Sequence, residues 1–454
     1  MDAMAWKQTV GEPRALISRR ALLHNCRVVR SHLPLGTRVC AIIKADAYGH
    51  GAAIVADTLC NITDSAAGSA MHRAVDALAV ASLDEAAALP VSVGGASAAL
   101  NRGEVDAVDE INEFEDQSSE TDPGEDALRK PQIIIFRPVE NAFLGRHRAK
   151  LEEAVRRRWV LTLCSPEAAD DLARIAESCG RRAEVQIMVD SGMTRTGVQT
   201  HALGELVQKV QGRPSLHLVA VGTHFASADE PENPFTIQQF ARFSRAVESV
   251  LPTDSHAARG VYRHAANSGA VFFSPSTPMD MVRPGLALLG VDPAGKPCLD
   301  RPLRPVLKWT APLIGLKDVP AGETVGYGQT WRAGRPTRIG LLPVGYADGY
   351  SRSFSNKAVV LVHGRPAPVV GRISMDLTTI DLTEFPHAVI GDEVTLLDSD
   401  PLSPASIYKL AQWADTIPYE VFCRIGPRIR RVAYDLEDDT PRATGRSTRI
   451  APEA

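Results

Sequence analysis

The stretch VCAIIKADAYGHG, residues 39–51, decides the fold. Residues 39–43 form a short apolar run, typical of a strand buried on both faces, and the run ends abruptly at Lys44. Gly49 and Gly51 then allow the backbone to turn sharply into a helix. Parallel α/β folds keep their chemistry at such strand ends, because side chains that leave a rigid strand there reach a cavity. The stretch therefore predicts a buried strand that delivers one lysine into a pocket.

Apolar surroundings would change the chemistry of Lys44. They disfavour the ammonium form, so the pKa falls and the free amine becomes a usable nucleophile or base. The structural alternative is a lysine whose stem packs along the strand end while its ammonium group stays in water. The strand-lysine-glycine pattern alone leaves both interpretations open.

Composition narrows the class of protein. The chain has 454 residues, 44% of them hydrophobic and 23% charged, as in soluble globular proteins with two or three domains. A net charge of −4 gives no electrostatic case for nucleic acid or an acidic membrane as partner, so a small molecule is expected. The seven cysteines include no CxxC pair, which argues against disulfides and structural zinc and indicates a reducing cytoplasm. No apolar run is long enough to predict a membrane anchor, and no metal is expected.

Strand-like and helix-like segments alternate through the first two thirds of the chain. Strands are expected at residues 39–43, 77–80, 132–136, 160–163, 183–189, 216–221, 261–264 and 281–283. Helical spacing separates them at residues 20–32, 52–59, 83–89, 146–157, 166–178, 203–210 and 236–250. Eight such repeats predict an α/β fold with a closed (β/α)₈ barrel. An open doubly wound sheet is the second choice, because no GxGxxG follows a strand.

Four composition changes set the expected domain boundaries. Residues 1–19 form an extended segment expected to pack on a later β domain, and residues 20–291 form the barrel. Residues 91–130 interrupt the barrel with an acidic insertion, for which a solvated charge run is the expected role. Residues 292–435 have glycine turns and short strands, the latter expected at 337–342, 358–362, 368–370 and 393–397, which predict an all-β C-terminal domain with one helix at 404–414. Residues 436–454 form a polar tail.

Polar residues follow several of the expected barrel strands. Arg195 suits capture of a carboxylate or phosphate, although surface salt bridges are the commoner role of arginine. A lone His224 would more often be a core histidine than a catalytic one. Ser268 and the backbone near Gly285 fit the phosphate site that the last two barrel loops commonly build. With Lys44 across the barrel mouth, such a site indicates a phosphate-bearing carbonyl cofactor, for which pyridoxal phosphate is the natural candidate.

The ordered motifs resemble alanine racemase, a fold-type III pyridoxal phosphate enzyme with a barrel and a C-terminal β domain. The resemblance runs from Ala15 to Arg430 apart from the acidic insertion, through the motifs KADAYGHG (44–51), VDSGMTRTG (189–197), GTHFASADE (222–230), HAANSGA (264–270), MVRPGLALLG (281–290), VGYGQTW (325–331), PVGYADGYSR (343–352), GRISMD (371–376) and IPYEV (417–421).

The resemblance implies a role for each matching residue. Lys44 would carry the cofactor and Tyr327 would be the opposed base. The phosphate would be bound by Tyr48, Ser268, Tyr419 and the backbone of Gly285 and Leu286, with Asn267 also in the cofactor site. Arg283 would face the pyridine nitrogen and keep it unprotonated, which disfavours transamination. Substrate contacts would come from Arg195, Met375 and the entrance residue Tyr346. His224, in the cofactor site, and His264 would hold Arg283 and Tyr327 in place, and Asp376 would be a further supporting residue.

The implied activity is interconversion of L-alanine and D-alanine, which supplies D-alanine for peptidoglycan. Racemisation removes a proton from one face of the α-carbon and returns one on the other, so two opposed bases suffice. In the family the tyrosine and the methionine come from the other subunit, which implies a homodimer with shared active sites. Two departures stand out: Met188 replaces a lysine that often orients the substrate arginine, and Ser374 replaces a frequent cysteine.

Other functions remain open from the sequence. A broader amino-acid racemase is one alternative, because pocket volume depends on loops that the sequence does not place. A non-catalytic pyridoxal phosphate carrier is another, although such carriers lack the opposing base that Tyr327 would supply. A decarboxylase on the same two-domain plan would be expected to show its own cysteine-bearing motif in the β domain, and none is found.

Overall fold

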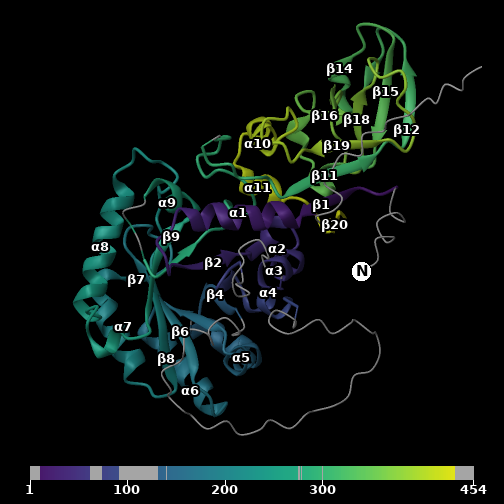
Figure 1. Cartoon of the computed structure of the whole chain (residues 1–454). Coiled ribbons are helices and arrows are strands. Elements are labelled where there is room, and N and C mark those ends of the chain that lie inside the picture. Colours follow the sequence, from purple (N-terminus) through teal and green to yellow (C-terminus); the bar gives the residue numbers. More distant parts are fainter. Residues whose placement is uncertain are drawn as a thin grey trace, which may run out of the picture.

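A computed structural model describes residues 11–61, 74–90, 131–139, 141–274, 277, 279–298 and 300–434. The predicted acidic insertion, residues 91–130, and the predicted polar tail, residues 436–454, lie outside these described residues. The described part forms two bodies, a barrel with its surrounding helices and a C-terminal domain of strands, which meet around helices α1, α2 and α11 (Figure 1).

The barrel is closed and parallel, as the sequence predicted. Neighbouring strands follow the order β5-β4-β3-β2-β10-β9-β8-β6, and β5 also pairs with β6 to close the circle. The strands are β2 (Arg38–Ile42), β3 (Ala77–Val80), β4 (Gln132–Pro138), β5 (Val160–Leu163), β6 (Ala183–Asp190), β8 (Leu216–Gly222), β9 (Tyr262–Asn267) and β10 (Met281–Arg283). The short β7 (Val198–Gln199) pairs with the end of β6. The expected alternative of an open sheet is therefore wrong.

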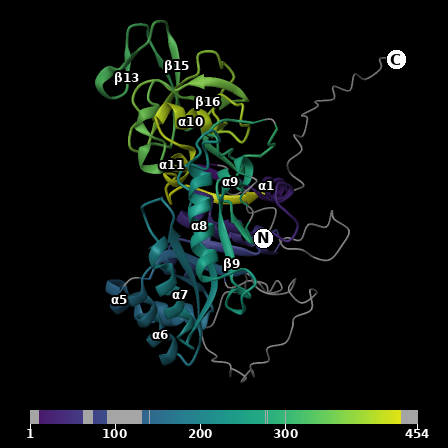
Figure 2. The same cartoon turned by 90° about the vertical axis from the view of Figure 1, so that its left-hand side faces the viewer.

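Helices lie outside the barrel, where Figures 1 and 2 show α5 to α8 side by side. Sequence chemistry sets their beginnings: Ser165 caps α6 by accepting a hydrogen bond from the Ala168 N–H, and Pro166 occupies its first turn. The helices are α1 (Arg19–Ser31), α2 (Lys44–Gly49), α3 (Ala52–Asn61), α4 (Leu83–Ala87), α5 (Asn141–Arg156), α6 (Pro166–Ser178), α7 (Leu203–Gln211), α8 (Phe235–Val250) and α9 (Ser268–Phe273).

The C-terminal domain consists mostly of strands, as predicted. Its largest sheet has the order β17-β16-β19-β11-β1-β20, and smaller sheets are β12-β15-β18 and β13-β14. The strands are β1 (Arg14–Ser18), β11 (Leu307–Pro312), β12 (Gly315–Val319), β13 (Thr324–Val325), β14 (Trp331–Arg332), β15 (Thr337–Leu342), β16 (Val359–Val362), β17 (Arg365–Pro368), β18 (Thr378–Asp381), β19 (Glu393–Leu397) and β20 (Arg430–Tyr434).

Two details of the C-terminal domain differ from the sequence prediction. The expectation of a single helix is wrong, because α10 (Ile407–Ala414) is followed by α11 (Pro418–Cys423). Pro418 starts α11, where its missing N–H costs nothing, and the sequence reading treated this short proline-led segment only as a motif. The strand expected at residues 368–370 lies earlier, at β17, since Val369 forms an isolated bridge with Ile380 instead.

The first strand of the chain belongs to the last domain. β1 lies between β11, to which it is antiparallel, and β20, to which it is parallel. Helix α1 follows β1 directly, and the Ser18 hydroxyl caps it by accepting from the Ala21 N–H at 3.1 Å. Because β1 leads straight into the barrel, the two domains are joined at both ends of the barrel segment.

Candidate active site

The lysine of the deciding stretch begins an unusual turn. Lys44 follows β2, and the four residues after it, Ala45 to Tyr48, all have φ between 51° and 53°. A left-handed turn of L-residues costs roughly 1–2 kcal/mol per residue, so tertiary contacts must hold it. The Glu85 carboxylate accepts the N–H of Ala45 at 3.1 Å, and Asp46 accepts the N–H of Ala52 at 2.7 Å. Helices α4 and α3 therefore fix the backbone on which Lys44 stands.

The C-terminal domain of the same chain braces this turn from the other side. Arg431, in β20, donates to the carbonyl oxygen of Gly49 at 2.9 Å and to three further carbonyls near the end of α11. Gly49 has φ 78°, and an added Cβ would lie 2.3 Å from the carbonyl oxygen of Phe422. Only glycine fits at this contact, which joins the lysine turn to α11.

The amine of Lys44 is easier to deprotonate than that of an ordinary lysine. The protein packed around it excludes water and lowers its pKa, and the positive charge of Arg195 lowers it further. Arg195 is exposed in the loop after β6, which Asp190 shapes by accepting the N–H groups of Gly192 and Thr194. Met188, at 6% exposure, lies in β6 and supplies no hydrogen-bonding group that could hold Arg195.

Residues predicted to bind a phosphate lie together at the ends of β9 and β10. The Ser268 hydroxyl accepts from the backbone N–H groups of Gly285 at 3.0 Å and Ala287 at 3.2 Å. A Cβ on Gly285 would lie 2.7 Å from the Tyr48 hydroxyl, so glycine at this position allows that hydroxyl to approach the backbone. Tyr48 and Tyr419 lie with their rings 5.6 Å apart, and Leu286 is buried beside Gly285.

The two phenols of this cradle remain protonated at neutral pH. Burial raises the pKa of Tyr48 above its usual value, and burial raises the pKa of Tyr419 to about 12. Each hydroxyl can therefore donate a hydrogen bond to an anion. Asn267 is at the start of α9, where its side-chain oxygen accepts from the Ala270 N–H at 3.1 Å.

Arg283 is buried inside the barrel, and both predicted histidines contact it. Its guanidinium donates to Nδ1 of His264, to the carbonyl oxygens of Thr223 and Ala265 at 2.6 and 3.1 Å, and to Nδ1 of His224 at 3.5 Å. Burial, followed by the charge of Arg283, lowers the pKa of His224 to about 3 and places that of His264 well below its usual value. Both histidines are therefore neutral, and one arginine carries the charge.

The predicted opposed base does not lie with Lys44. Tyr327 is in the short 3₁₀ turn Tyr327–Gln329 between β13 and β14, and 72% of its side chain is exposed. Figures 1 and 2 place β13 and β14 at the end of the C-terminal domain that lies away from the barrel. Tyr346 and Met375, exposed by 43% and 54%, are on the surface of the same domain.

Ion pairs hold the loops that carry Tyr346 and Met375. Arg428 donates to Asp348 at 2.8 Å and to Asp376 at 2.9 Å, and Asp348 also accepts the N–H of Gly345 at 2.9 Å. Asp376 thus supports the surface of the C-terminal domain instead of the barrel mouth.

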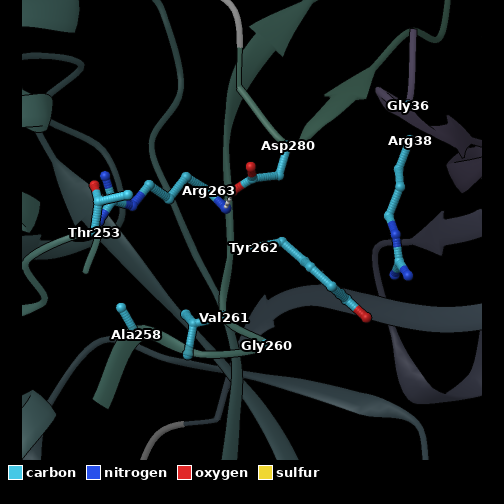
Figure 3. A pocket seen from close by; sticks show the side chains of 9 residues that line it. All are labelled: Gly36, Arg38, Thr253, Ala258, Gly260, Val261, Tyr262, Arg263 and Asp280. Carbon is cyan, nitrogen blue, oxygen red and sulfur yellow. Dashed lines mark hydrogen bonds between the residues drawn. The ribbon is translucent and has the colours of Figure 1, made fainter. Parts of the chain in front are cut away.

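Figure 3 shows a cavity of about 380 Å³. It lies at the end of the barrel opposite Lys44, because Lys44 follows the end of β2 and the cavity is lined by Arg38 at its beginning. It is lined where β2, β9 and β10 begin, and contains none of the predicted site residues. The Arg38 guanidinium lies 4.1 Å from the ring centre of Tyr262, while Arg263 points in a different direction (Figure 3). Its cationic groups do not converge on one point, so this cavity is not the active site.

Sequence reasoning missed three residues around Lys44. Glu85 was visible only as part of the pattern Ser82-x-x-Glu85 that begins α4, yet its carboxylate binds the N–H groups of Ala81 and Ala45. Arg431 carried no signal, because its partners are backbone carbonyls. Cys423 lies near enough to Lys44 for their charges to influence each other, while burial raises its pKa.

Two further classes of site are absent from the described residues. Within the ranges given above, no group of histidine, cysteine, aspartate or glutamate side chains could hold a metal ion. The same part of the chain contains no helix with the length and apolar character needed to cross a membrane.

Comparisons with known proteins show the family to which the chain belongs. The family description "Alanine racemase, N-terminal domain" matches residues 17–293, and "Alanine racemase, C-terminal domain" matches residues 306–433. The chain is 35% identical over 419 residues to an alanine racemase of Desulfovibrio desulfuricans, covering 92% of this chain and 97% of that protein.

Two solved structures show the same architecture. The alanine racemase of Streptomyces coelicolor A3(2) aligns with a TM-score of 0.73 and 30% identity, covering 95% of this chain and 100% of that one. The alanine racemase of Bartonella henselae, solved with covalently bound pyridoxal phosphate, aligns with a TM-score of 0.70 and 26% identity over 93% of this chain and 100% of that one. With both domains matched in order, the chain belongs to the alanine racemase family.

Proposed function

We propose that the protein interconverts L-alanine and D-alanine with pyridoxal phosphate, supplying D-alanine for peptidoglycan, and that Lys44 and Tyr327 are its two bases. The observation that carries the proposal is the placement of Lys44, with its lowered pKa, beside the cradle of Tyr48, Ser268 and Gly285. An activated amine beside an anion cradle is what a phosphate-bearing aldehyde cofactor requires.

The residues present fit pyridoxal phosphate. Gly285 allows the Tyr48 hydroxyl to lie close to the backbone, and the Tyr48 and Tyr419 hydroxyls are protonated donors for a phosphate. Arg283 supplies a buried positive charge, which would face the pyridine nitrogen without protonating it. When bound, the cofactor withdraws electrons from the α-carbon of the amino acid and so acidifies its α-proton.

The protein's own residues then move the proton. The amine of Lys44 accepts a proton on one face of the α-carbon, and its ammonium form returns one, because the lowered pKa keeps part of the lysine neutral. Tyr327 would do the same on the other face. Arg195, exposed at the barrel mouth close to Lys44, would bind the substrate carboxylate.

The position of Tyr327 supports a shared active site in a homodimer. Its side chain is 72% exposed, and it lies between β13 and β14, at the end of the C-terminal domain away from the barrel, so it is free to enter the site of a second copy. Tyr346 and Met375, also exposed on this domain, would accompany it. A two-fold dimer built in this way pairs each Lys44 with Tyr327 of the partner subunit.

Mixing two inactive variants tests the activity and the shared site together. Lys44→Ala and Tyr327→Phe homodimers are each expected to lose racemisation of alanine, and in the second the exchange of the α-proton should fail for one enantiomer. After dissociation and random reassociation, half the dimers are hybrids with one intact site each, so about a quarter of the activity should return. Alanine in deuterated water, followed by α-proton exchange and chirality, provides the assay. No recovery despite hybrid formation would contradict the shared site, and no activity in the unaltered enzyme would contradict the function.

We also propose a cytoplasmic location. All seven cysteines, which lie within the described residues, are free thiols, as expected in a reducing compartment. Mass measurement of the protein isolated from its cells under alkylating conditions would check this.

A further inference from the structure

A continuous line of hydrogen bonds crosses the inside of the barrel from Arg283. Nη1 of Arg283 bonds to Nδ1 of His264, and Nε2 of His264 lies 3.0 Å from Oε1 of Gln186. Nε2 of Gln186 lies 2.7 Å from the Thr162 hydroxyl, which lies 2.5 Å from the carbonyl oxygen of Ile135. The line passes from β10 through β9, β6 and β5 to β4.

Every member of this line is shielded from water. His264, Gln186 and Thr162 are fully buried, and Arg283 is 3% exposed. Unpaired polar groups would be costly at such depth, so each atom is constrained to the partner it has. Gln186 is a fully buried polar residue in the middle of β6, and the family resemblance assigned it no role.

The chemistry of the two ends fixes the direction of every bond. The Ile135 carbonyl can only accept, so the Thr162 hydroxyl gives it its single proton and has only lone pairs left for Gln186. Gln186 must then offer its NH₂ to Thr162 and its oxygen to His264. At the other end, a guanidinium can only donate, so Nδ1 of His264 must be unprotonated.

We propose that Gln186 and Thr162 are positioning residues that hold His264 as the tautomer protonated at Nε2, so that its Nδ1 can anchor the guanidinium of Arg283. The proposal rests on the proposed function, because it assigns Arg283 to the cofactor side of the barrel. Neither residue touches the reacting atoms. Thr162 sets the orientation of the Gln186 amide, which decides which nitrogen of His264 is protonated. The unprotonated nitrogen then orients Arg283.

Loss of the Thr162 hydroxyl would release this constraint. The Gln186 amide could then rotate and present its NH₂ to Nε2 of His264, which would favour the tautomer protonated at Nδ1. That proton would point at the N–H groups of Arg283, and the arginine would lose its anchor. His264 has little space to rotate away, because its ring fills the place of the missing side chain of Gly222: a Cβ there would lie 2.0 Å from the ring.

The charges around His264 agree with this assignment. The titratable groups that face it are Arg283, from β10, and His224, after β8. Burial is the largest cause of the lowered pKa of His264, and both of these groups lower it further. Gln186 and Thr162, from β6 and β5, are neutral at every pH. The ring therefore stays neutral. The line of hydrogen bonds from Ile135 to Arg283, called the relay below, then decides which of its two nitrogens carries the proton.

Nitrogen NMR of histidine-labelled full-length protein tests the relay without any turnover. The unaltered protein should show His264, identified by its loss in His264→Gln, with a protonated Nε2 and an unprotonated Nδ1. Thr162→Val and the isosteric Gln186→Met should change or mix these signals. Thr162→Ser, which restores the hydroxyl, should return the original pattern.

Thr58→Val is the matched control for Thr162→Val. Thr58 is also fully buried in the barrel domain and donates to a backbone carbonyl, that of Ile54 at 2.7 Å, but lies in α3 away from Arg283. Both variants lose one hydroxyl and should unfold at similar denaturant concentrations. Only Thr162→Val should lower kcat of the loaded enzyme, by about tenfold, the effect of one hydrogen bond to a charged group. It should also raise the share of alanine converted to keto acid.

Two results would overturn the relay. One is a protonated Nδ1 on His264 in the unaltered protein. The other is a His264 spectrum, kcat and keto-acid yield in Thr162→Val equal to those in Thr58→Val. Absence of racemisation in the unaltered enzyme would instead overturn the proposed function, which the nitrogen spectrum does not measure.

Discussion

Replacing Arg431 by methionine should separate the lysine turn from the C-terminal domain. Methionine keeps the apolar stem of Arg431 but removes four hydrogen bonds of 2.6–2.9 Å to backbone carbonyls, one of them on Gly49. A bond from a charged group contributes roughly 1.5–3 kcal/mol to stability, and partial hydration of the freed carbonyls returns some of the sum. The expected loss in the free energy of unfolding is about 3–5 kcal/mol, at the upper end for one substitution.

The neighbouring arginine provides the control. Arg430 is exposed in the same strand, so Arg430→Met should change the free energy of unfolding by less than about 0.5 kcal/mol. Urea unfolding of both variants, followed by circular dichroism, measures the difference. Titration with pyridoxal phosphate should also show weaker binding to Arg431→Met, because the turn that carries Lys44 loses its brace. Equal unfolding and equal binding in the two variants would refute the reasoning.

Three further perturbations test the site itself. Gly285→Ala should weaken pyridoxal phosphate binding about ten- to a hundredfold, measured by titration, because its Cβ would lie 2.7 Å from the Tyr48 hydroxyl; unchanged affinity would contradict the cradle. Lys44 has a lowered pKa, so its reaction with an amine reagent should rise at lower pH than that of an exposed lysine; mass spectrometry across a pH series would check the order. Glu85→Gln, in which an NH₂ replaces one acceptor facing Ala45 or Ala81, should lower kcat about tenfold with little change in substrate KM. An unaltered kcat would show that Glu85 does not position Lys44.

Strands and helices could be predicted where the local sequence pattern matched the burial that the fold imposes. β3, β5 and β10 have the predicted bounds, since each is a short and mostly apolar run that the closed barrel buries. The proline-led α11 was missed because six residues give too short a pattern for helical periodicity. The four residues with positive φ after Lys44 were not predicted either, because contacts from α3 and α4, distant in sequence, impose them.

Some residues of the candidate site could also be predicted from the sequence and others could not. Lys44, Ser268 and Arg283 stand at strand ends inside recognisable motifs, so their positions could be read from the sequence. Gln186 and Thr162 gave no motif, because their role depends on a line of contacts across five strands that only the closed barrel brings together. The role of Arg431 could not be predicted either, because its partners are backbone carbonyls, which every residue has.

The position of β1 has a consequence for how the protein is made. Its neighbours β11 and β20 begin about three hundred and four hundred residues later, so a ribosome exposes β1 long before either partner exists. At ordinary synthesis speeds the wait is on the order of tens of seconds. During that time both edges of the strand RALIS lack their pairing partners, and an N-terminally truncated chain would leave β11 and β20 without the strand between them. Circular permutation that joins residues 11–18 to the end of the C-terminal domain would remove this delay during synthesis.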